Sequence, residues 1–384
     1  MKIIIAPDSF KGSLTAREIA DNIEKGILSV YPQAEVIKLP MADGGEGTVD
    51  ALVYATKGKK IYKEVTGPLG TPVKAYFGIL GNENTAIIET AAASGLALVP
   101  SGKENPLKAT TFGTGELIKA ALDEGVDKII IGLGGSATVD GGIGMAQALG
   151  ISFKDSKGKE VGFGGAELAN VQSIDLSNLD RRLKDVEFLI ASDVSNPLYG
   201  PNGAAYIFGP QKGATEEMVK FLDDSLRNYA RVIKNETGKK VGDLPGGGAA
   251  GGLGAALMVF LDAYMNSGIE LILDIYNFNT FLDQAALVIT GEGRIDKQTL
   301  MGKTPYGVAM RAKKYNVPVI AVAGSVEAEA VNELNEYFDG IFSIMLAPVT
   351  LEKAILNTEN WLQIIVQQIM RTCIVHKKIG RAHV

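Results

Sequence analysis

Several apolar runs in this 384-residue chain are followed directly by an acid or a cation, and often by glycines. Carboxylates can accept a proton or hold a hard metal ion, cations can bind an anion, and glycines let a ligand approach the backbone closely. Because ligands of open α/β sheets bind at the carboxyl ends of strands, we expect the loops that carry these residues to gather at one site. The candidates are Asp8, Ser9, Lys11, Asp43, Glu46, Asp193, Arg294, Asp296 and Lys303.

The rarest residue types exclude the commonest nucleophilic sites. The chain has one cysteine, Cys373, and two histidines, His376 and His383, so residues 1–372 contain neither a thiol nor an imidazole. A Ser-His-Asp triad, a Cys-His pair and a thiolate or imidazole zinc site are therefore excluded from that part of the chain. Acid–base work falls to Asp, Glu, Lys or Tyr, and any metal is a hard ion with oxygen ligands, Mg²⁺ above all.

The stretch LVITGEGRIDKQTLMGKTPYG, residues 287–307, ends in a Gly-Lys-Thr like that of a phosphate loop. Such a loop needs a glycine five residues before Gly302, where this chain has Lys297. The stretch instead predicts a long loop and a helix with Pro305 in its first turn, whose free N–H groups attract anions. Phosphate recognition by side chains and the helix end is one interpretation, and a charged surface loop that caps a helix is the other.

The segment GLGGSATVDGG, which begins at residue 132, matches a loose dinucleotide fingerprint after an apolar strand. The full fingerprint also needs an acid that closes the next strand about twenty residues later. There the chain has Asp155 in a polar, turn-like stretch. The match is therefore weak, and an NAD(P)-dependent hydroxyacid oxidoreductase is only a remote alternative.

Charge and hydropathy indicate a cytoplasmic protein with small-molecule partners. The net charge of −6 and the pI near 5.3 argue against nucleic acid as the main partner, because no basic excess exists to neutralise phosphates. No apolar run reaches the ~18 residues of a membrane span. The opening MKIIIAPDSF is too short and too soon interrupted to be a signal peptide. A homo-oligomer is compatible with the sequence.

Strand and helix patterns alternate at both ends of the chain, whereas the middle is mixed. This predicts an α/β fold of two domains: residues 1–65 and 283–375 form an open sheet from both chain ends, and residues 66–282 form an inserted mixed α/β domain. A cleft between such domains is a common place for a small-molecule site. Residues 377–384, KKIGRAHV, fit no amphipathic pattern and are expected to be a non-native tail.

A series of segments, read in order, resembles the bacterial glycerate kinases of the class I type. The segments are APDSFKGSLTA, MADGGEGTVDAL, VTGPLG, IIETAAASGL, NPLKATTFGTGELI, GLGGSATVDGG, SDVSNPLYGPNGAA, FGPQKGAT, GGGAAGGLGAAL and VITGEGRIDKQTLMGKTPYGVA. They extend from residue 1 to about residue 372. One departure is Val139, where we expect asparagine before Asp140 in many members of the family.

The resemblance implies a flavodoxin-like domain and a domain of restriction-endonuclease-like topology. It also implies ATP-dependent phosphorylation of D-glycerate, most often to 2-phosphoglycerate, with ATP and Mg²⁺ as cofactors. Phosphorylation of the 3-hydroxyl, giving 3-phosphoglycerate, is the alternative. An oxidoreductase and a non-catalytic sensor of a phosphorylated metabolite are the other classes of function that we weigh.

Roles for the acids follow from phosphoryl transfer, which needs positioning, charge neutralisation and an acceptor for the hydroxyl proton. Asp43 and Asp193 are the candidate bases, and the one that does not take the proton holds Mg²⁺. We assign the metal to Asp193 and Glu46, with Glu292 as an alternative in its outer shell. The competing interpretation is that Asp43 and Asp193 only cap the turns that follow them.

The cations and remaining polar side chains are assigned to the substrate. Arg294 suits the carboxylate of glycerate, and a catalytic role, because its guanidinium forms two parallel hydrogen bonds; an ordinary surface ion pair is the alternative. Lys11, Lys212 or Lys303 would neutralise transferred charge, with Lys11 as the catalytic choice. The further substrate-binding candidates are Asp8, Ser9, Asp296 and Lys303.

Two glycine-rich segments are candidates for binding the phosphates of ATP, since successive backbone N–H groups form anion-binding concavities. The first segment is Gly134–Ser136. The second segment, Gly246–Gly252, could instead allow close helix packing. The residues assigned to ATP are Gly134, Gly135, Ser136, Gly247, Gly248 and Gly251.

Overall fold

The computed structural model describes residues 1–42, 44–81 and 83–381, and side chains as far as Cys373. Contacts between residues divide the chain into two units: unit 1 contains residues 1–43 and 269–384, and unit 2 contains residues 44–268. Asp43 and the side chains of the predicted non-native tail, 377–384, lie outside the described residues.

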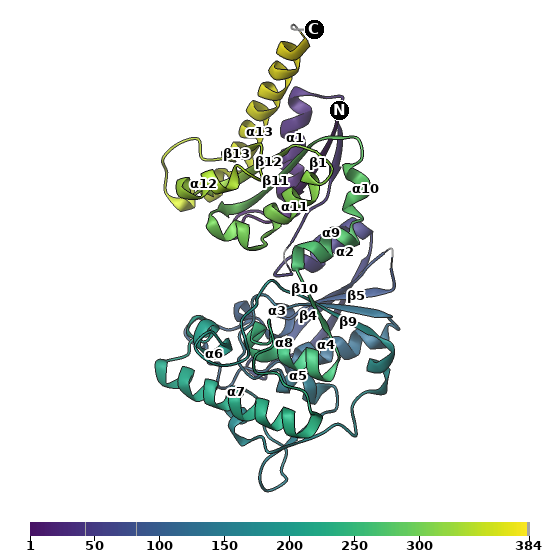
Figure 1. The fold of residues 1–384 in the computed structure, drawn as a ribbon, viewed down its shortest axis with the longest axis vertical. Helices are drawn as coiled ribbons and strands as arrows, with labels where there is room; N and C mark the ends of the chain where they lie inside the picture. The colour runs from purple at the N-terminus through teal and green to yellow at the C-terminus, as the bar shows by residue number, and fades with distance from the viewer. Residues whose placement is uncertain (43, 82, 382–384) are drawn as a thin grey trace. The chain divides into compact units, whose positions relative to one another are not determined.

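Unit 1 is built on a five-stranded parallel sheet (Figure 1). Its order is β2-β1-β11-β12-β13, which is 2-1-3-4-5 when the strands are counted along the unit. In doubly wound sheets of this order the ligand site lies where the order reverses, between the first and third strands. The strands are β1 (Lys2–Pro7), β2 (Glu35–Lys38), β11 (Ala285–Ile295), β12 (Val319–Val326) and β13 (Gly340–Ser343).

Helices cover both faces of this sheet, because alternate residues of a strand point to opposite faces. Ile3, Ile289 and Val322 share a buried cluster with α1 and α13, which lie side by side (Figure 1). Helix α11 contacts β1, β11 and β12, and its buried Val308 lies outside that cluster, so it covers the other face. The helices are α1 (Ala16–Val30), α9 (Gly268–Ile275), α10 (Phe278–Leu282), α11 (Thr304–Lys313), α12 (Ala328–Leu334) and α13 (Leu351–Arg381), with a 3₁₀ turn, η5 (Lys297–Met301).

Helix α1 shows how the sequence sets these elements. Thr15 caps it: the Thr15 hydroxyl accepts a hydrogen bond from the Glu18 amide, and the Glu18 carboxylate accepts one from the Thr15 amide. Ile19, Ile23 and Ile27 recur every four residues and are fully buried. The cap fixes where the helix begins, and the apolar stripe fixes which side faces the sheet.

Unit 2 is built on a six-stranded mixed sheet of order β10-β9-β6-β5-β4-β3. Strands β5, β6, β9 and β10 are parallel, and β3 and β4 add an antiparallel edge. The carboxyl ends of the four parallel strands therefore meet at one edge. The strands are β3 (Lys59–Thr66), β4 (Pro72–Ile79), β5 (Thr85–Glu89), β6 (Lys128–Gly132), β9 (Glu187–Ala191) and β10 (Tyr264–Asn266); β7 (Ser152–Lys154) and β8 (Ser173–Asp175) form a separate pair.

The main core of unit 2 lies on one face of this sheet. Phe77, Ile88, Ile131 and Ile190 share a buried cluster there with residues of α4, α5, α7 and α8. The helices of the unit are α2 (Thr48–Thr56), α3 (Ala91–Ser94), α4 (Phe112–Asp123), α5 (Ile143–Ala148), α6 (Ala204–Phe208), α7 (Glu216–Thr237) and α8 (Ala249–Phe260). Its 3₁₀ turns are η1 (Leu96–Leu98), η2 (Gly165–Asn170), η3 (Arg181–Asp185) and η4 (Pro210–Lys212).

The α/β class expected from the sequence is confirmed, with one parallel and one mixed sheet. The unit boundaries fall at 43/44 and 268/269, whereas the sequence pattern placed them at 65/66 and 282/283. Packing explains the difference. In unit 2, Val53 of α2 lies against Gly78 of β4, and in unit 1, Ile269 lies against Gly307 of α11.

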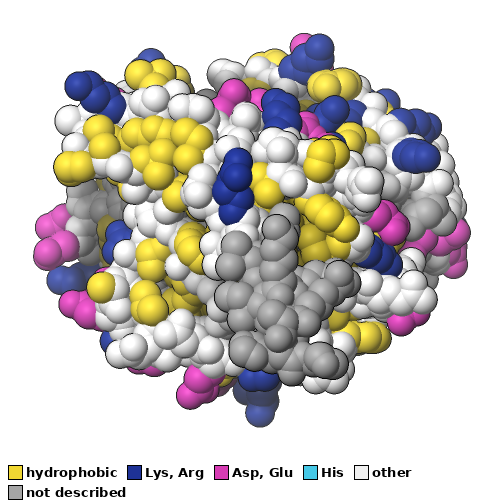
Figure 2. Space-filling model, turned by 90° about the horizontal axis from the view of Figure 1, so that it is seen from above, with side chains coloured by type: hydrophobic (Ala, Val, Ile, Leu, Met, Phe, Trp, Pro, Cys, Tyr) yellow, Lys and Arg dark blue, Asp and Glu magenta, His cyan; other side chains and the backbone are white. Residues whose placement is uncertain are grey.

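None of the helices among the described residues has the length and apolar content that a membrane span requires. On the face seen in Figure 2, Lys and Arg side chains are dispersed among acidic and hydrophobic ones. The described surface in that view shows no continuous basic area of the kind that contacts a nucleic acid.

Candidate functional site

Asp8 links the end of β1 to the beginning of α11. Its amide donates a 2.8 Å hydrogen bond to the Gly291 carbonyl of β11. Its Oδ1 accepts from the Ser9 amide at 2.6 Å, and its Oδ2 accepts from the Thr304 hydroxyl at 2.8 Å. The carboxylate therefore lies at the end of β1, beside Gly291 of β11, and the strand order of unit 1 reverses between these two strands.

Glu292 provides a buried carboxyl at the same edge. Its Oε1 accepts a 2.7 Å hydrogen bond from the Thr299 hydroxyl, and its Oε2 lies 3.6 Å from Lys303 Nζ, which is also 3.8 Å from Asp296 Oδ1. Burial raises the pKa of Glu292 to about 7, and the negative charges of Asp8 and Asp296 add to the rise, while Thr299 and Lys303 oppose it. The carboxyl can therefore exchange a proton near neutral pH.

Two cations complete this edge of unit 1. The Arg294 side chain is 65% exposed, with Nε 3.4 Å from Asp296 Oδ2 and Nη2 3.9 Å from Glu327 Oε1. Lys11 is exposed, and its backbone lies against Gly293, where an added Cβ would be 3.5 Å from the Lys11 nitrogen. Because exposed ion pairs are weak, the guanidinium can exchange its partners for the carboxylate of a ligand.

The structure thus brings six of the predicted site residues to the carboxyl ends of β1 and β11. Asp296 also has a local role, because it caps η5 by accepting a 2.8 Å hydrogen bond from the Gln298 amide. The six are Asp8, Ser9, Lys11, Arg294, Asp296 and Lys303.

In unit 2, the loop after β6 presents backbone donors. Gly134 and Gly135 form a turn with a left-handed φ of +71° at Gly135, and neither amide donates a hydrogen bond within the described part of the chain. The loop is held by the Leu96 amide, which donates to the Gly135 carbonyl at 2.8 Å. Successive free amides in a turn form an anion-binding concavity.

The predicted metal ligands lie at this edge too. Gly44 passes across the ends of β6 and β9: an added Cβ there would be 2.5 Å from the Ala191 carbonyl oxygen. The exposed Glu46 follows in that loop, and the exposed Asp193 follows β9. The described residues contain no group of three or more His, Cys, Asp or Glu placed to hold a metal. Mg²⁺ bound with a nucleotide commonly takes only one or two protein carboxylates, so the chemistry of this pair fits such an ion.

The second glycine-rich segment has a packing role instead. The amides of Gly247, Gly248 and Gly251 donate to carbonyls of the chain itself, at 2.9, 3.0 and 3.2 Å. Gly251 has a φ of +70°, and an added Cβ would lie 1.9 Å from the Thr138 carbonyl oxygen. These three amides are occupied, so the structure does not support their assignment to ATP phosphates. Close packing, the competing interpretation, accounts for the glycines.

Two ionisable residues of unit 2 are buried: Glu89, which was not singled out from the sequence, and Lys212, which was named only as a candidate for neutralising transferred charge. Glu89, at the end of β5, accepts a 2.7 Å hydrogen bond from the Val49 amide of α2, and burial raises its pKa to about 7. An acid directly after the apolar TAII run was the available signal. Lys212 is 2% exposed, and burial lowers its pKa to about 7, opposed by the charge of Asp140. The turn-like GPQKG around Lys212 gives no sign of burial.

Comparison with known proteins identifies the family of the chain. The model of the glycerate kinase family matches residues 3–374. The chain belongs to the glycerate kinase family. It is 53% identical to a glycerate kinase of Bacillus subtilis (strain 168), over 94% of this chain and 95% of the relative. It is also 53% identical to a glycerate 2-kinase of Escherichia coli (strain K12), over 92% and 93% of the two chains.

A solved structure extends the likeness to the fold. The crystal structure of a glycerate kinase 2 from Salmonella typhimurium LT2 superposes with a TM-score of 0.89 at 50% sequence identity. The match covers 98% of this chain and 99% of the other. This member of the glycerate kinase family is therefore an enzyme of the kinase class, and the oxidoreductase and sensor alternatives are set aside.

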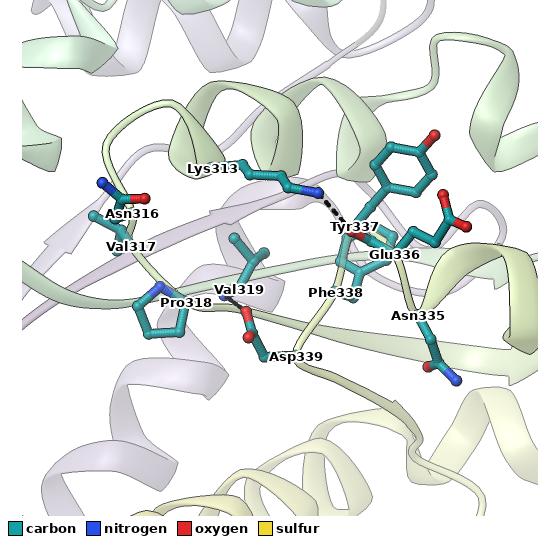
Figure 3. Close-up of a pocket in the computed structure, with 10 residues that line it drawn as sticks. All are labelled: Lys313, Asn316, Val317, Pro318, Val319, Asn335, Glu336, Tyr337, Phe338 and Asp339. Carbon is teal, nitrogen blue, oxygen red and sulfur yellow. Dashed lines mark hydrogen bonds between the residues drawn. The ribbon is translucent and has the colours of Figure 1, made fainter.

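A hollow of about 270 Å³ in unit 1 of this glycerate kinase family member lies away from the candidate residues, at the amino-terminal ends of β12 and β13 (Figure 3). Two of its polar side chains are already engaged: Lys313 donates to the Glu336 carbonyl at 2.9 Å, and Asp339 accepts from the Val319 amide at 2.8 Å. Ligands of open α/β sheets bind at the opposite, carboxyl edge. We assign no substrate to this hollow.

Proposed function

We propose that the chain transfers the γ-phosphoryl group of ATP to D-glycerate and releases 2-phosphoglycerate. The observation that carries this proposal is the edge of unit 1, where Lys303 lies 3.6 Å from the buried, titratable carboxyl of Glu292 and the exposed Arg294 and Lys11 lie on the neighbouring backbone. The E. coli relative, named a glycerate 2-kinase, supports the 2-hydroxyl as the acceptor. Glycerate offers a carboxylate for the cations and hydroxyls for the acids, which matches this set of groups.

Arg294 binds the carboxylate of glycerate in this proposal, and Lys303 and Lys11 neutralise charge on the transferred group. The guanidinium is exposed and its ion pairs are long, at 3.4 and 3.9 Å, so it can turn to a bidentate carboxylate. Asp8 and Asp296 each accept hydrogen bonds within the chain, yet a carboxylate has about four acceptor positions. They can therefore also orient a glycerate hydroxyl, with Ser9 beside them.

The acceptor of the hydroxyl proton is a carboxylate, since residues 1–372 contain no histidine. Asp43 and Asp193 remain our proposals for the base and for a ligand of the metal. Glu292 joins them as a candidate base, because a pKa of about 7 suits proton transfer at neutral pH.

For the nucleotide we propose the amides of Gly134 and Gly135, together with Ser136, as phosphate ligands. Glu46 and Asp193 would hold Mg²⁺, which neutralises phosphate charge when bound. The amides of Gly134 and Gly135, which donate no hydrogen bond within the described part of the chain, support this assignment.

Finer features of the fold and setting remain proposals. The strand order 2-1-3-4-5 supports a flavodoxin-like description of unit 1. A restriction-endonuclease-like topology for unit 2, a cytoplasmic location and a homo-oligomer remain predictions from the sequence.

The proposal is tested by release of ADP from ATP in the presence of D-glycerate, followed in a coupled assay. Turnover must depend on D-glycerate and be far slower with D-lactate, which keeps the carboxylate and the 2-hydroxyl but lacks the 3-hydroxyl. ADP release that is independent of the acid would contradict the proposal.

A further inference from the structure

Lys212 is a buried lysine without a direct acidic partner among the described residues. Lys212 is 2% exposed. Its Nζ donates to the Ser136 hydroxyl at 2.8 Å and to the Thr138 carbonyl at 2.7 Å. Asp140 is the charged group that faces it, but the Asp140 oxygens accept from Thr111, at 2.8 and 2.9 Å, and from the Gly142 amide, at 3.1 Å. Among the described residues no ion pair within 4.0 Å includes Lys212.

An ammonium in such a place is costly unless something compensates for its lost hydration. Here the partners are one hydroxyl and one carbonyl, both neutral. When Lys212 is protonated, its positive charge is therefore incompletely balanced at the base of the Gly134–Ser136 loop. A dianionic or trianionic group bound on that loop would supply the missing counter-charge.

The direction of the hydrogen bond also decides what Ser136 can do. When protonated, Lys212 has three N–H donors and no acceptor, so Ser136 Oγ is then the acceptor of this bond. The Ser136 proton then points elsewhere, and no acceptor for it exists among the hydrogen bonds of the described residues. With the free amides of Gly134 and Gly135, Ser136 offers a third donor at the carboxyl end of β6.

We propose that Lys212 is a positioning residue for the phosphates of the nucleotide: its buried ammonium fixes the Ser136 hydroxyl as a donor and gives the Gly134–Gly135 loop its positive potential. This inference rests on the proposed function. It assigns Lys212 an indirect role, through Ser136, rather than direct contact with the transferred group.

The test measures binding of ATP alone, without glycerate, by titration calorimetry. Ser136→Ala and Lys212→Met are each expected to weaken ATP binding about tenfold, because a hydrogen bond to a charged group is lost or misdirected. The double variant is expected to bind no more weakly than the weaker single variant, since Lys212 acts through Ser136. Lys212→Arg, which keeps the charge and the donors, should recover part of the loss.

Lys239→Met is the matched control. Lys239 also donates to a backbone carbonyl of unit 2, that of Val259 at 2.7 Å. Its replacement by methionine is expected to leave ATP binding within twofold of the parent. If Lys212→Met does not fold, as judged by circular dichroism, Ser136→Ala alone decides.

ATP binding within twofold of the parent for Ser136→Ala, or losses that multiply in the double variant, would overturn the inference while the function stands. A parent that neither binds ATP nor phosphorylates glycerate would overturn both.

Discussion

The Thr304 hydroxyl donates a 2.8 Å hydrogen bond to Asp8 Oδ2, joining residues 296 positions apart in the sequence. Thr304 is fully buried and is the first residue of α11, and Asp8 follows β1. The bond fixes the N-terminus of α11 against the end of β1. The anion-attracting end of the helix is thereby placed among the cations and acids of unit 1.

Removal of this bond should destabilise unit 1. Thr304→Val keeps the shape of the side chain but leaves the Asp8 carboxylate short of one donor, which costs on the order of 2 kcal/mol. The free energy of unfolding from urea titration measures the loss. Thr304→Ser, which keeps the hydroxyl, should retain most of the stability. Equal stability of Thr304→Val and the parent would show that the bond contributes nothing.

Arg294→Ala should impair glycerate binding without harming the fold. We expect KM for D-glycerate to rise about tenfold or more, KM for ATP to change less than threefold, and stability to change by less than about 0.5 kcal/mol, as for exposed ion pairs. Arg294→Lys should recover little, because an ammonium cannot form the bidentate pair. Arg182→Ala is the control, since Arg182 is also exposed and paired with acids, in unit 2. Equal KM values for glycerate in the two alanine variants would remove Arg294 from the site.

Glu292 should impose a pH dependence on both stability and activity. Its pKa is about 7 in the folded protein and 4.5 ordinarily, so its contribution to stability is full below pH 4.5 and is lost as the pH rises through 7. A shift of this size corresponds to roughly 3 kcal/mol. The difference in free energy of unfolding between Glu292→Gln and the parent should therefore favour the variant more at pH 8 than at pH 5.

The pH dependence of kcat/KM distinguishes a catalytic Glu292 from an ordinary buried acid. If Glu292 accepts the proton, kcat/KM of the parent rises with pH through about 7, and Glu292→Gln lacks this rise. Glu89→Gln is the matched comparison, because burial also raises the pKa of Glu89 to about 7. Glu89→Gln should change the pH dependence of stability but keep the rise of kcat/KM with pH. If kcat/KM of Glu292→Gln still rises with pH through about 7, Glu292 is excluded as the base.

Lys212 should take up a proton when ATP binds. Burial lowers its pKa to about 7, so at pH 8 the amine is mostly neutral, and nearby phosphate charge raises the pKa again. Calorimetry of ATP binding in two buffers of different ionisation enthalpy measures this uptake. Lys212→Met should lose it and Lys239→Met should keep it, with Asp140 unchanged in both. The same uptake in Lys212→Met would assign the proton to another group.

Much of the edge of unit 1 could be predicted from the sequence. The acid or cation that follows each apolar run marks the carboxyl end of a strand, and parallel pairing brings those ends together. The positions of Asp8, Arg294 and Lys303 at this edge were predicted in this way, and their roles remain proposals. The α/β class follows from the same alternation of strand and helix patterns.

Features that depend on packing could not be predicted. The Gly134 amide donates no hydrogen bond within the described part of the chain, whereas the Gly248 amide does. The sequence cannot distinguish these two glycines, because only tertiary contacts decide which amide meets a carbonyl. Helix α2 joins unit 2 because Val53 meets Gly78, a contact between segments that periodicity does not relate. The burial of Lys212 likewise depends on the loops around it.

The most direct test of the account is proton-coupled ³¹P NMR of the product formed from ATP, Mg²⁺ and D-glycerate. Phosphorus on the 2-hydroxyl couples to one carbon-bound proton, and phosphorus on the 3-hydroxyl couples to two. We predict a new phosphomonoester doublet that grows with the signals of ADP. A triplet would show that the 3-hydroxyl is the acceptor, and the absence of any new phosphomonoester would contradict the proposed function.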